Sequence, residues 1–349
     1  MGEGSARSAT FSVTDLKTAR NPARMWRSRS VRTGILLKKT FRNLRGLAVF
    51  SGLTVNTVIW FIPIFLFAIL KLLVPVNSFR RVMTQWIMAM GESWVSWNAV
   101  ILALKSSNRV DTRGLEGLKR EDWYLVIANH QTWVDIIALQ VVLNRRIPFL
   151  KFFIKQQLIW FPLLGIAWWA MDMPFMKRYS KSYLAKYPEK KGKDFEATRI
   201  ACGKFRNTPT TVINFVEGTR FTPEKKIRRN SPFKYLLPPR AGGVALALTS
   251  MGNVFDSVLD ISIAYPNGVV QFWALCCGEF SGVIIDINKR PVEKWMVDGD
   301  YENDREYRGR FHRWLTQIWQ EKDEQIERLL GENSAPKTRS SSRTPVRDS

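Results

Sequence analysis

The sequence predicts an α/β domain, built on a mixed, largely parallel sheet flanked by helices and preceded by N-terminal membrane-associated helices. Two observations carry this prediction. Residues 46–70 contain no charged side chain, and beyond residue 108 short apolar runs alternate with helical stretches. Such alternation is typical of α/β domains. We expect a basic, flexible tail over 1–45, membrane-anchoring helices over 46–105, the α/β domain over 106–332 and a disordered tail over 333–349.

The charge balance predicts an anionic partner. The chain has 53 basic and 30 acidic side chains, a formal net charge of +23. Such an excess suits either nucleic acid or a membrane surface that carries acidic lipids. The 14 Trp residues favour the membrane, because indole rings prefer the headgroup layer. The three cysteines (Cys202, Cys276 and Cys277) form neither a disulfide framework nor a zinc-site pattern, and suggest a reducing compartment.

Residues 1–45 hold eleven basic and two acidic side chains. This charged region is too long for a signal peptide, and no short apolar core with a small-residue cleavage site follows it. The uncharged stretch at 46–70 would span about 37 Å as a helix, compared with a hydrocarbon core of roughly 30 Å. Pro63 should kink that helix. The alternative is a helix buried in a soluble core.

Basic residues flank the apolar stretch on both sides, with Arg42 and Arg45 before it and Lys71, Arg80 and Arg81 after it. The positive-inside rule therefore places both ends on the cytoplasmic side. A re-entrant helix would satisfy both flanks, as would a monotopic hairpin completed by residues 79–104, whose Trp and Met side chains suit an interfacial helix.

The α/β region follows from residue 108. The apolar runs at 124–128 and 211–216 predict buried strands, and 131–143, 196–206 and 241–251 predict helices. Residues 258–264 and 268–274 predict a strand pair joined by a turn at Pro266, Asn267 and Gly268. Residues 302–330 predict an amphipathic helix on the outside of the domain.

The string NHQTWVD at 129–135 places His130 directly after the first predicted strand. His130 and Asp135 could not meet within one helix or one strand. They meet only if His130 ends the strand and Thr132 caps a helix whose first turn presents Asp135. A carboxylate that holds one imidazole nitrogen leaves the other free to accept a proton. The alternative is a structural histidine beside a helix cap.

A second motif follows the second predicted strand. Glu217, Gly218, Thr219 and Arg220 form the string EGTR, in which Gly allows close backbone approach to a ligand and Arg suits a phosphate. The alternative is a solvated loop with ordinary surface charges. The string FMKR at 175–178 could supply another phosphate-binding arginine, Arg178.

Taken together, these motifs resemble those of the glycerophospholipid acyltransferase family, of the lysophosphatidic acid type. NHQTWVD resembles its NHxxxxD signature, EGTR its second hallmark, and FMKR the block written G-x-x-F-x-x-R. Lys155 begins a stretch similar to the family's Lys-x-x-Leu segment, and residues 236–240 resemble an LLP-[RK] element. Two positions depart from the pattern. Asp172 replaces the Gly of the FMKR block, and residues 260–266 match the family's Pro-containing block only with the Pro displaced.

The resemblance implies that 106–332 is an acyltransferase catalytic domain. His130 would be the general base on the acceptor hydroxyl and Asp135 would orient it. Arg220 and Arg178 would bind the acceptor phosphate, with Lys155, Glu217, Gly218 and Thr219 in the same substrate-binding set. It implies acyl-CoA or acyl carrier protein as co-substrate, with no bound cofactor and no metal. The acceptor would be a lysophospholipid, foremost 1-acyl-glycerol-3-phosphate.

Other readings remain open at this point. The acceptor could be lysophosphatidylglycerol, lysophosphatidylinositol or glycerol 3-phosphate. A non-catalytic, membrane-tethered protein that binds nucleic acid or anionic lipid would also explain the charge, but no nucleic-acid-binding motif is present and nucleic acid is not expected. We expect a membrane location, the inner membrane if the protein is bacterial, with the catalytic domain facing the cytoplasm.

Overall fold

The computed structural model describes residues 22–104, 110–176, 186–187, 203, 205, 208–251 and 254–332, the side chains of 22–35 excepted. Its described residues contain a six-stranded sheet with the order β1-β8-β7-β2-β6-β3. The strands are β1 (Val110–Arg113), β2 (Tyr124–Ala128), β3 (Leu150–Phe152), β6 (Thr211–Phe215), β7 (Ser257–Ala264) and β8 (Val283–Pro291). Every neighbouring pair is parallel except β7 and β8. The fold is therefore the expected α/β type with a mixed, largely parallel sheet.

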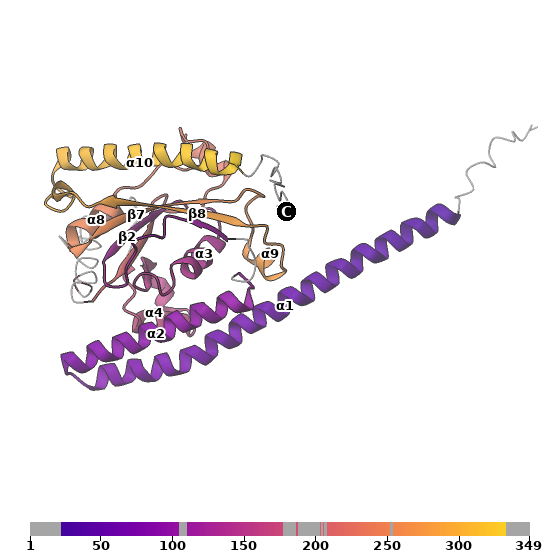
Figure 1. Cartoon of the computed structure of the whole chain (residues 1–349), viewed down its shortest axis with the longest axis horizontal. Coiled ribbons are helices and arrows are strands. Elements are labelled where there is room, and N and C mark those ends of the chain that lie inside the picture. The colour runs from indigo at the N-terminus through magenta and orange to yellow at the C-terminus, as the bar shows by residue number, and fades with distance from the viewer. Residues whose placement is uncertain are drawn as a thin grey trace, which may run out of the picture.

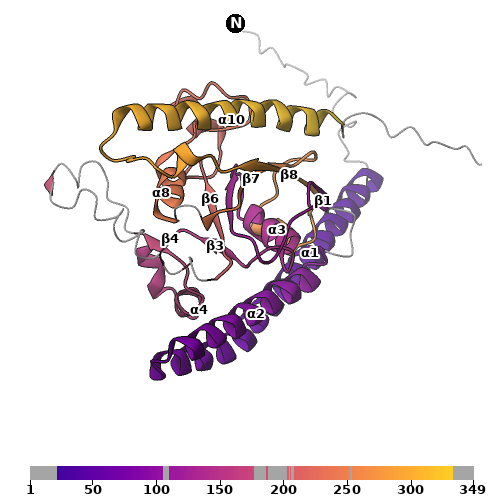
Figure 2. The same cartoon turned by 60° about the vertical axis from the view of Figure 1, so that its left-hand side comes forward.

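Helices cover both faces of this sheet (Figures 1 and 2). Helices α8 (Gly242–Met251) and α10 (Arg305–Glu332) lie on one face, and α3 (Val134–Leu143) lies on the other. The side chains of β2 alternate between the two cores. Leu125 and Ile127 pack with the α8 and α10 side, whereas Tyr124, Val126 and Ala128 pack with the α3 side. A strand buried on both faces explains why YLVIA is apolar throughout.

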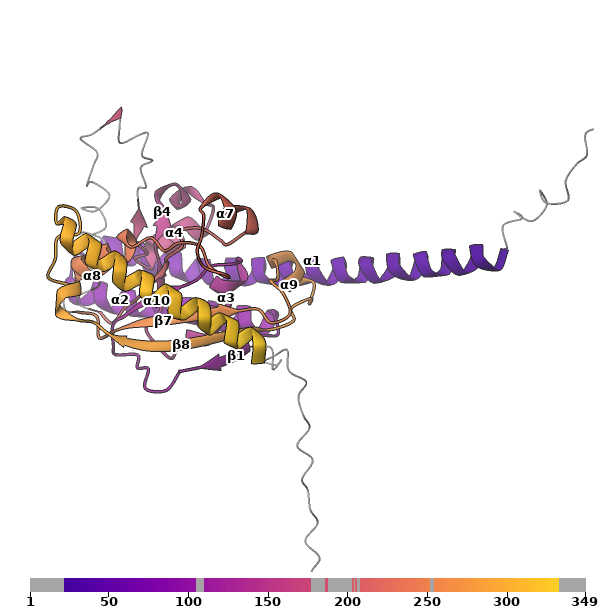
Figure 3. The same ribbon diagram turned by 90° about the horizontal axis from the view of Figure 1, so that it is seen from above.

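Helix α10 is amphipathic, as the sequence predicts, and crosses the sheet diagonally (Figure 3). Its buried side chains include Phe311, Leu315, Ile318, Trp319 and Ile326, at helical spacing, while the intervening side chains are mostly exposed. The indole of Trp319 donates a hydrogen bond to the backbone oxygen of Leu237 at 3.0 Å. The helix therefore closes one core of the domain.

Helices α1 (Pro22–Leu73) and α2 (Asn77–Ile101) form an antiparallel hairpin on the α3 side of the sheet (Figure 1). Asn56 lies inside this hairpin, where its amide donates to the oxygens of Trp94 and Asn98 at 3.1 and 2.9 Å. Helix α1 continues through Pro63 and begins at Pro22, so residues 22–45 are helical where the sequence predicts a flexible tail. The hairpin thus satisfies its polar side chain internally.

Within the described residues, one helical stretch, Leu36–Leu73 of α1, is long and apolar enough to cross a membrane. Its apolar side chains are largely exposed, among them Ile59 at 58%, Leu66 at 54% and Leu73 at 71%. A helix buried in a soluble core would hide these groups. The buried-core alternative is therefore wrong, and the exposed apolar surface suits membrane association.

The predicted strand at 268–274 is wrong. The turn at 265–268 is present, with Gly268 at φ +92°, but it leads into helix α9 (Phe272–Cys276). The antiparallel partner of β7 is β8. The β-branched run at 283–287 is the stronger strand signal, and pairing along β7 uses it. Most of the predicted helix at 196–206 and the tail at 333–349 lie outside the described residues.

Candidate active site

Two loops meet at the carboxyl edge of the sheet, because they follow neighbouring parallel strands. Strands β2 and β6 pair in register with Ala128 beside Phe215, so His130 and Glu217 each follow a strand end by two residues. The backbone N–H of Phe221 donates to the oxygen of His130 at 2.7 Å. This is the edge at which open α/β sheets place their binding sites.

His130 and Asp135 are in contact, as their spacing predicts. His130 Nδ1 lies 2.9 Å from Asp135 Oδ2, and the Asp135 carboxylate is fully buried. Asp135 lies in the first turn of α3, and its Oδ2 also accepts the backbone N–H groups of Gln131 and Thr132 at 2.6 and 2.9 Å. Three hydrogen bonds thus converge on one carboxylate oxygen.

The expected capping role of Thr132 is wrong. Helix α3 begins at Val134 after Trp133, and the Thr132 hydroxyl lies 3.5 Å from the backbone N–H of Val134, too far for a strong cap. That hydroxyl instead donates to the oxygen of Val270 at 2.8 Å. The side chain that accepts backbone N–H groups just before the helix is instead Asp135, which binds those of Gln131 and Thr132.

Tyr265 is a member of this site that the sequence did not reveal. It follows the end of β7, and its hydroxyl donates to Asp135 Oδ1 at 2.6 Å, the oxygen that His130 does not contact. Burial raises the pKa of the Tyr265 phenol above its usual range, and the Asp135 charge raises it further. The phenol therefore stays protonated and remains a donor. The signal was the Tyr-Pro pair at 265–266, but only the strand order reveals that β7 adjoins β2.

The imidazole of His130 is fixed by an aromatic ring on its face as well as by Asp135 at Nδ1. Its ring stacks on Phe215 with centroids 4.1 Å apart, and Phe215 in turn stacks on Phe152. With Nδ1 engaged by Asp135, Nε2 is the nitrogen that can accept a proton. The His130 side chain is 12% exposed, so a ligand can reach it from one side.

Asn129, just before His130, joins the loop to β7. Its amide nitrogen donates to the oxygen of Ile263 at 2.9 Å, and its amide oxygen accepts the Ile263 N–H at 2.8 Å. Gln131 donates a further bond to the same Ile263 oxygen at 3.0 Å. The Asn129 side chain thus makes the pair of backbone hydrogen bonds that a neighbouring strand would make. These bonds fix the position of the His130 loop relative to the end of β7.

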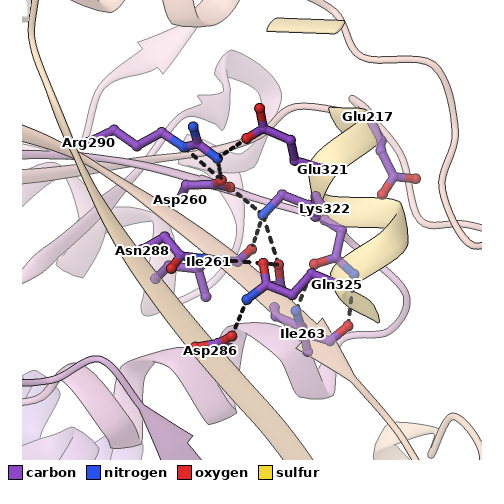
Figure 4. Close-up of polar contacts among 12 residues, drawn as sticks. Glu217, Asp260, Ile261, Ile263, Asp286, Asn288, Arg290, Glu321, Lys322 and Gln325 are labelled. Carbon is purple, nitrogen blue, oxygen red and sulfur yellow. Dashed lines mark hydrogen bonds and ion pairs between the residues drawn. The ribbon is translucent and has the colours of Figure 1, made fainter. Parts of the chain in front are cut away.

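A buried ionic network contacts β7 from the α10 side of the sheet (Figure 4). Lys322 of α10 is buried and donates to the oxygen of Ile261 at 2.6 Å, while its Nζ lies 2.5 Å from Asp260. Asp260 also pairs with Arg290 of β8 at 3.0 Å. Burial lowers the pKa of Lys322, and the Asp260 carboxylate opposes that effect. The network fixes β7 two residues before Ile263.

Glu217 has a structural position, although the sequence places it in the substrate-binding set. Its side chain is fully buried, and its oxygens accept the backbone N–H groups of His130 and Leu237 at 3.1 and 3.2 Å. Burial raises the pKa of the Glu217 carboxyl to about 8, while the two backbone bonds act in the opposite direction. Glu217 therefore holds the His130 loop against the loop of Leu237.

The rest of the EGTR loop is more open. Gly218 adopts φ +68°, and a Cβ there would lie 3.1 Å from the Arg240 side chain, so both conformation and space favour Gly. Lys225 Nζ donates to the Thr219 hydroxyl and the Arg220 oxygen at 2.9 and 2.8 Å. Thr219 is thus engaged within the loop.

Arg220 lies beside the His130 loop. Its guanidinium stacks over the Trp133 ring at 5.0 Å, and Trp133 immediately precedes α3. Cation–π contact holds the guanidinium plane while leaving its N–H donors for a ligand. The structure therefore brings together His130, Asp135 and Arg220 at one edge.

Of the remaining predicted residues, Lys155 is exposed at the end of β4 (Ile154–Lys155), which pairs with β5 (Phe175–Met176). It follows β3 at the same carboxyl edge of the sheet. Arg178 lies outside the described residues. Asp172 adopts φ +55°, a left-handed conformation that Gly adopts without strain, and its carboxylate pairs with Lys71 of α1 at 2.7 Å. Its charge is thus neutralised by α1.

A family model described as Acyltransferase matches residues 109–265. The chain is 24% identical over 254 residues to lysocardiolipin acyltransferase 1 of Gallus gallus, covering 68% of this chain and 61% of that protein. It is 23% identical over 228 residues to 1-acyl-sn-glycerol-3-phosphate acyltransferase delta of Homo sapiens, covering 61% and 55%. It is 25% identical over 253 residues to 2-acyl-1-lysophosphatidylinositol acyltransferase of Saccharomyces cerevisiae, covering 60% and 62%. The matched region thus spans little more than half the length of these relatives.

Proposed function

We propose that this chain, whose residues 109–265 match an acyltransferase family model, acylates a lysophospholipid. A fatty acyl group passes from acyl-CoA or acyl carrier protein to the free hydroxyl of 1-acyl-glycerol-3-phosphate, which gives phosphatidic acid. The observation that carries this proposal is the 2.9 Å contact between His130 Nδ1 and Asp135 Oδ2, which leaves Nε2 as a base beside Arg220.

The reaction needs one proton carrier. His130 Nε2 removes the proton of the acceptor hydroxyl as its oxygen attacks the thioester carbonyl carbon. Asp135 stabilises the imidazolium that forms. When the C–S bond breaks, the imidazolium returns the proton to the departing thiolate, so the products are the phospholipid and the free thiol. The backbone N–H groups of Gln131 and Thr132 are bound to Asp135, so the oxyanion uses other donors.

His130 is not the only group that orients Asp135. The Tyr265 hydroxyl and two backbone N–H groups fix both of its oxygens, and Glu217 fixes the backbone of His130. Tyr265 and Glu217 are therefore positioning residues in this proposal. Arg220 binds the acceptor phosphate through its N–H donors. Lys155 and Arg178 are further candidates for that phosphate.

The lipid acceptor explains the apolar hairpin. A lysophospholipid lies in the bilayer, and the exposed apolar side of α1 suits the same layer. In this proposal the protein is bound to a membrane, which is the inner membrane if the protein is bacterial. Basic residues at both ends of the apolar stretch support a cytoplasmic catalytic domain in this proposal, on the side where soluble thioester donors are available.

A second acceptor class is favoured by the names of the relatives. They are named for lysocardiolipin, 1-acyl-glycerol-3-phosphate and lysophosphatidylinositol, which differ in headgroup and share a phosphate. An acceptor such as lysophosphatidylinositol or lysophosphatidylglycerol would use the same base and the same Arg220. A non-catalytic anion-binding protein would not need the buried hydrogen bonds that orient Asp135.

The test incubates the purified full chain with a panel of lysophospholipids and both thioester donors, and measures product masses. We expect transfer to 1-acyl-glycerol-3-phosphate that His130→Ala abolishes while the protein stays folded and membrane-bound. The matched control is His312→Ala, because His312 is exposed on α10 and its one hydrogen-bond partner among the described residues is Tyr301. Turnover retained by His130→Ala would remove the general base from the proposal.

A further inference from the structure

A cleft of about 800 Å³ lies at the edge of the sheet opposite to His130. Its walls include Arg120, Phe149 and Thr210, which lie at the amino ends of β2, β3 and β6, whereas His130 follows the carboxyl end of β2. A five-residue strand is about 16 Å long. The cleft and the candidate active site are therefore separated by about the length of strand β2.

The cleft carries excess positive charge. Among the described residues, its lining contains five basic side chains, Lys71, Arg80, Arg81, Arg120 and Lys151, and two carboxylates, Glu92 and Asp172. Both carboxylates are already paired. Arg120 contacts Glu92 at 2.6 Å, and Lys71 contacts Asp172 at 2.7 Å. Arg80 and Arg81 therefore have no carboxylate partner among the described residues, and a concave surface with such cations attracts anions.

Arg80 and Arg81 supply the donors that an anion needs. They lie in the first turn of α2, where the amino end of the helix also favours negative charge. Arg80 uses its Nε to donate to the oxygen of Val74 at 3.2 Å, and Arg81 contacts the Ser78 hydroxyl at 3.5 Å. Each guanidinium has five N–H donors. Both forks therefore have donors beyond these two contacts.

The surroundings of the cleft are apolar and exposed. The tip of the α1–α2 hairpin exposes Leu72 at 56%, Leu73 at 71% and Val76 at 55%. Val82 and Trp86 are exposed on α2 itself. At about 100° per residue they fall on the opposite side of the helix from Arg80, Thr84 and Met88, which line the cleft. Cations next to exposed apolar side chains are typical of surfaces that hold a lipid headgroup.

We propose that this cleft binds the phosphate group of an anionic phospholipid, with Arg80 and Arg81 as its principal contacts. The exposed apolar tip of the hairpin enters the acyl layer, and the cleft receives the phosphate of a lipid at the adjacent headgroup level. This lipid is neither acceptor nor product at His130, because the sheet separates the two sites. The proposal holds whether or not the chain transfers acyl groups.

The test measures phosphate binding without turnover. The full chain is studied in neutral detergent micelles at low ionic strength, in an Arg220→Gln background that weakens the proposed acceptor site. Dihexanoyl phosphatidylglycerol, dihexanoyl phosphatidylcholine and inorganic phosphate are each titrated while the thermal unfolding midpoint is followed. We expect phosphatidylglycerol to raise the midpoint with a saturable dependence, and phosphatidylcholine to have little effect.

Three variants locate the binding. Arg80→Gln/Arg81→Gln should weaken the apparent Kd for phosphatidylglycerol on the order of tenfold, since two charge-assisted contacts are lost. Gln85→Glu keeps both arginines, adds a negative charge to the lining and should weaken the Kd in the same direction. Arg313→Gln/Arg328→Gln removes the same charge from the exposed side of α10 and should leave the Kd unchanged.

Three results would overturn the proposal. Coincident titrations for the parent, Arg80→Gln/Arg81→Gln and Gln85→Glu would show that the cleft binds no anion. Equal losses in the α10 control would show a general charge effect. Inorganic phosphate that binds as tightly as phosphatidylglycerol would identify a free phosphate as the occupant and overturn the lipid assignment. A cooperative thermal unfolding transition of Arg80→Gln/Arg81→Gln without lipid, with a midpoint close to that of the parent, shows that the variant is folded.

Discussion

The hydroxyl of Tyr265 donates a 2.6 Å hydrogen bond to Oδ1 of Asp135, while His130 contacts Oδ2 of the same carboxylate. The phenol and the imidazole therefore share one buried anion, although they come from β7 and from the loop after β2. A change at Tyr265 alters the partner of the proposed base without touching a substrate.

Tyr265→Phe is expected to change the pH dependence of the reaction. Without the phenol, the Asp135 charge is less stabilised and holds a protonated His130 more strongly. The acidic limb of kcat/KM should therefore move to higher pH, and kcat/KM should fall on the order of tenfold for loss of a bond to a charged group. The measurement is kcat/KM between pH 5 and 9. Tyr301→Phe, which removes a hydroxyl beside His312, is the control. An unshifted limb with reduced stability alone would contradict the positioning role.

Glu217→Gln is expected to change how stability depends on pH. The folded-state pKa of about 8 exceeds the ordinary value of 4.5, so between these values the folded chain keeps a proton that the unfolded chain has lost. The free energy of unfolding of the parent should therefore fall as pH rises from 4.5 to 8, by about 1.4 kcal/mol per pH unit at most. The variant lacks this titration. Thermal unfolding across that range measures the difference between the two proteins, and a constant difference would refute the burial argument.

Arg220→Gln is expected to raise KM for phosphate-bearing acceptors with a smaller effect on kcat. Loss of a charge-assisted contact of about 1.5–3 kcal/mol corresponds to roughly tenfold or more in KM. Arg220→Lys should restore only part of the loss, because an ammonium cannot form the planar fork. Arg228→Gln on α7 (Pro223–Arg228) is the matched control, being an exposed arginine of the same segment. An unchanged KM would place the phosphate elsewhere.

Asp172→Ala is expected to destabilise the protein more than Asp172→Gly does. Both lose the ion pair with Lys71, but Ala must also adopt the left-handed conformation that Asp172 has at φ +55°. The difference should be about 1 kcal/mol in the free energy of unfolding. Lys71→Ala removes the same ion pair and leaves the backbone of Asp172 unchanged, so its effect should fall between those of Asp172→Gly and Asp172→Ala. Equal destabilisation by Ala and Gly would show that the backbone at this position carries no strain.

Local sequence patterns located the elements that carry the proposed site. The apolar runs around Val126 and Ile213 predict β2 and β6, and the five-residue spacing of His130 and Asp135 predicts a strand end followed by a helix turn. These are short-range properties, because burial on both faces and a loop of five residues, 129–133, leave few alternatives.

The pairing of strands that lie far apart in the sequence could not be predicted from local patterns. Tyr265 becomes part of the site only because β7 lies beside β2, a neighbour relation that depends on strand order rather than local pattern. The same limit explains the error at 268–274, where β8 pairs with β7 from further along the chain. The resemblance placed Glu217 in the substrate-binding set, shaping its loop. Its burial between two backbone donors depends on how the loops of His130 and Leu237 meet, which local pattern does not show.

The hydrogen bond between the Phe221 N–H and the His130 oxygen has a geometric consequence. It joins the loop that carries the base to the loop that carries Arg220, so the two cannot separate without breaking it. In the proposed reaction the distance between His130 and Arg220 is therefore fixed. It selects acceptors by the distance between their phosphate and their reactive hydroxyl. Acceptors that keep this span can differ in whatever extends outward beyond the phosphate, whereas a longer spacer between the two groups would leave the hydroxyl out of register with His130.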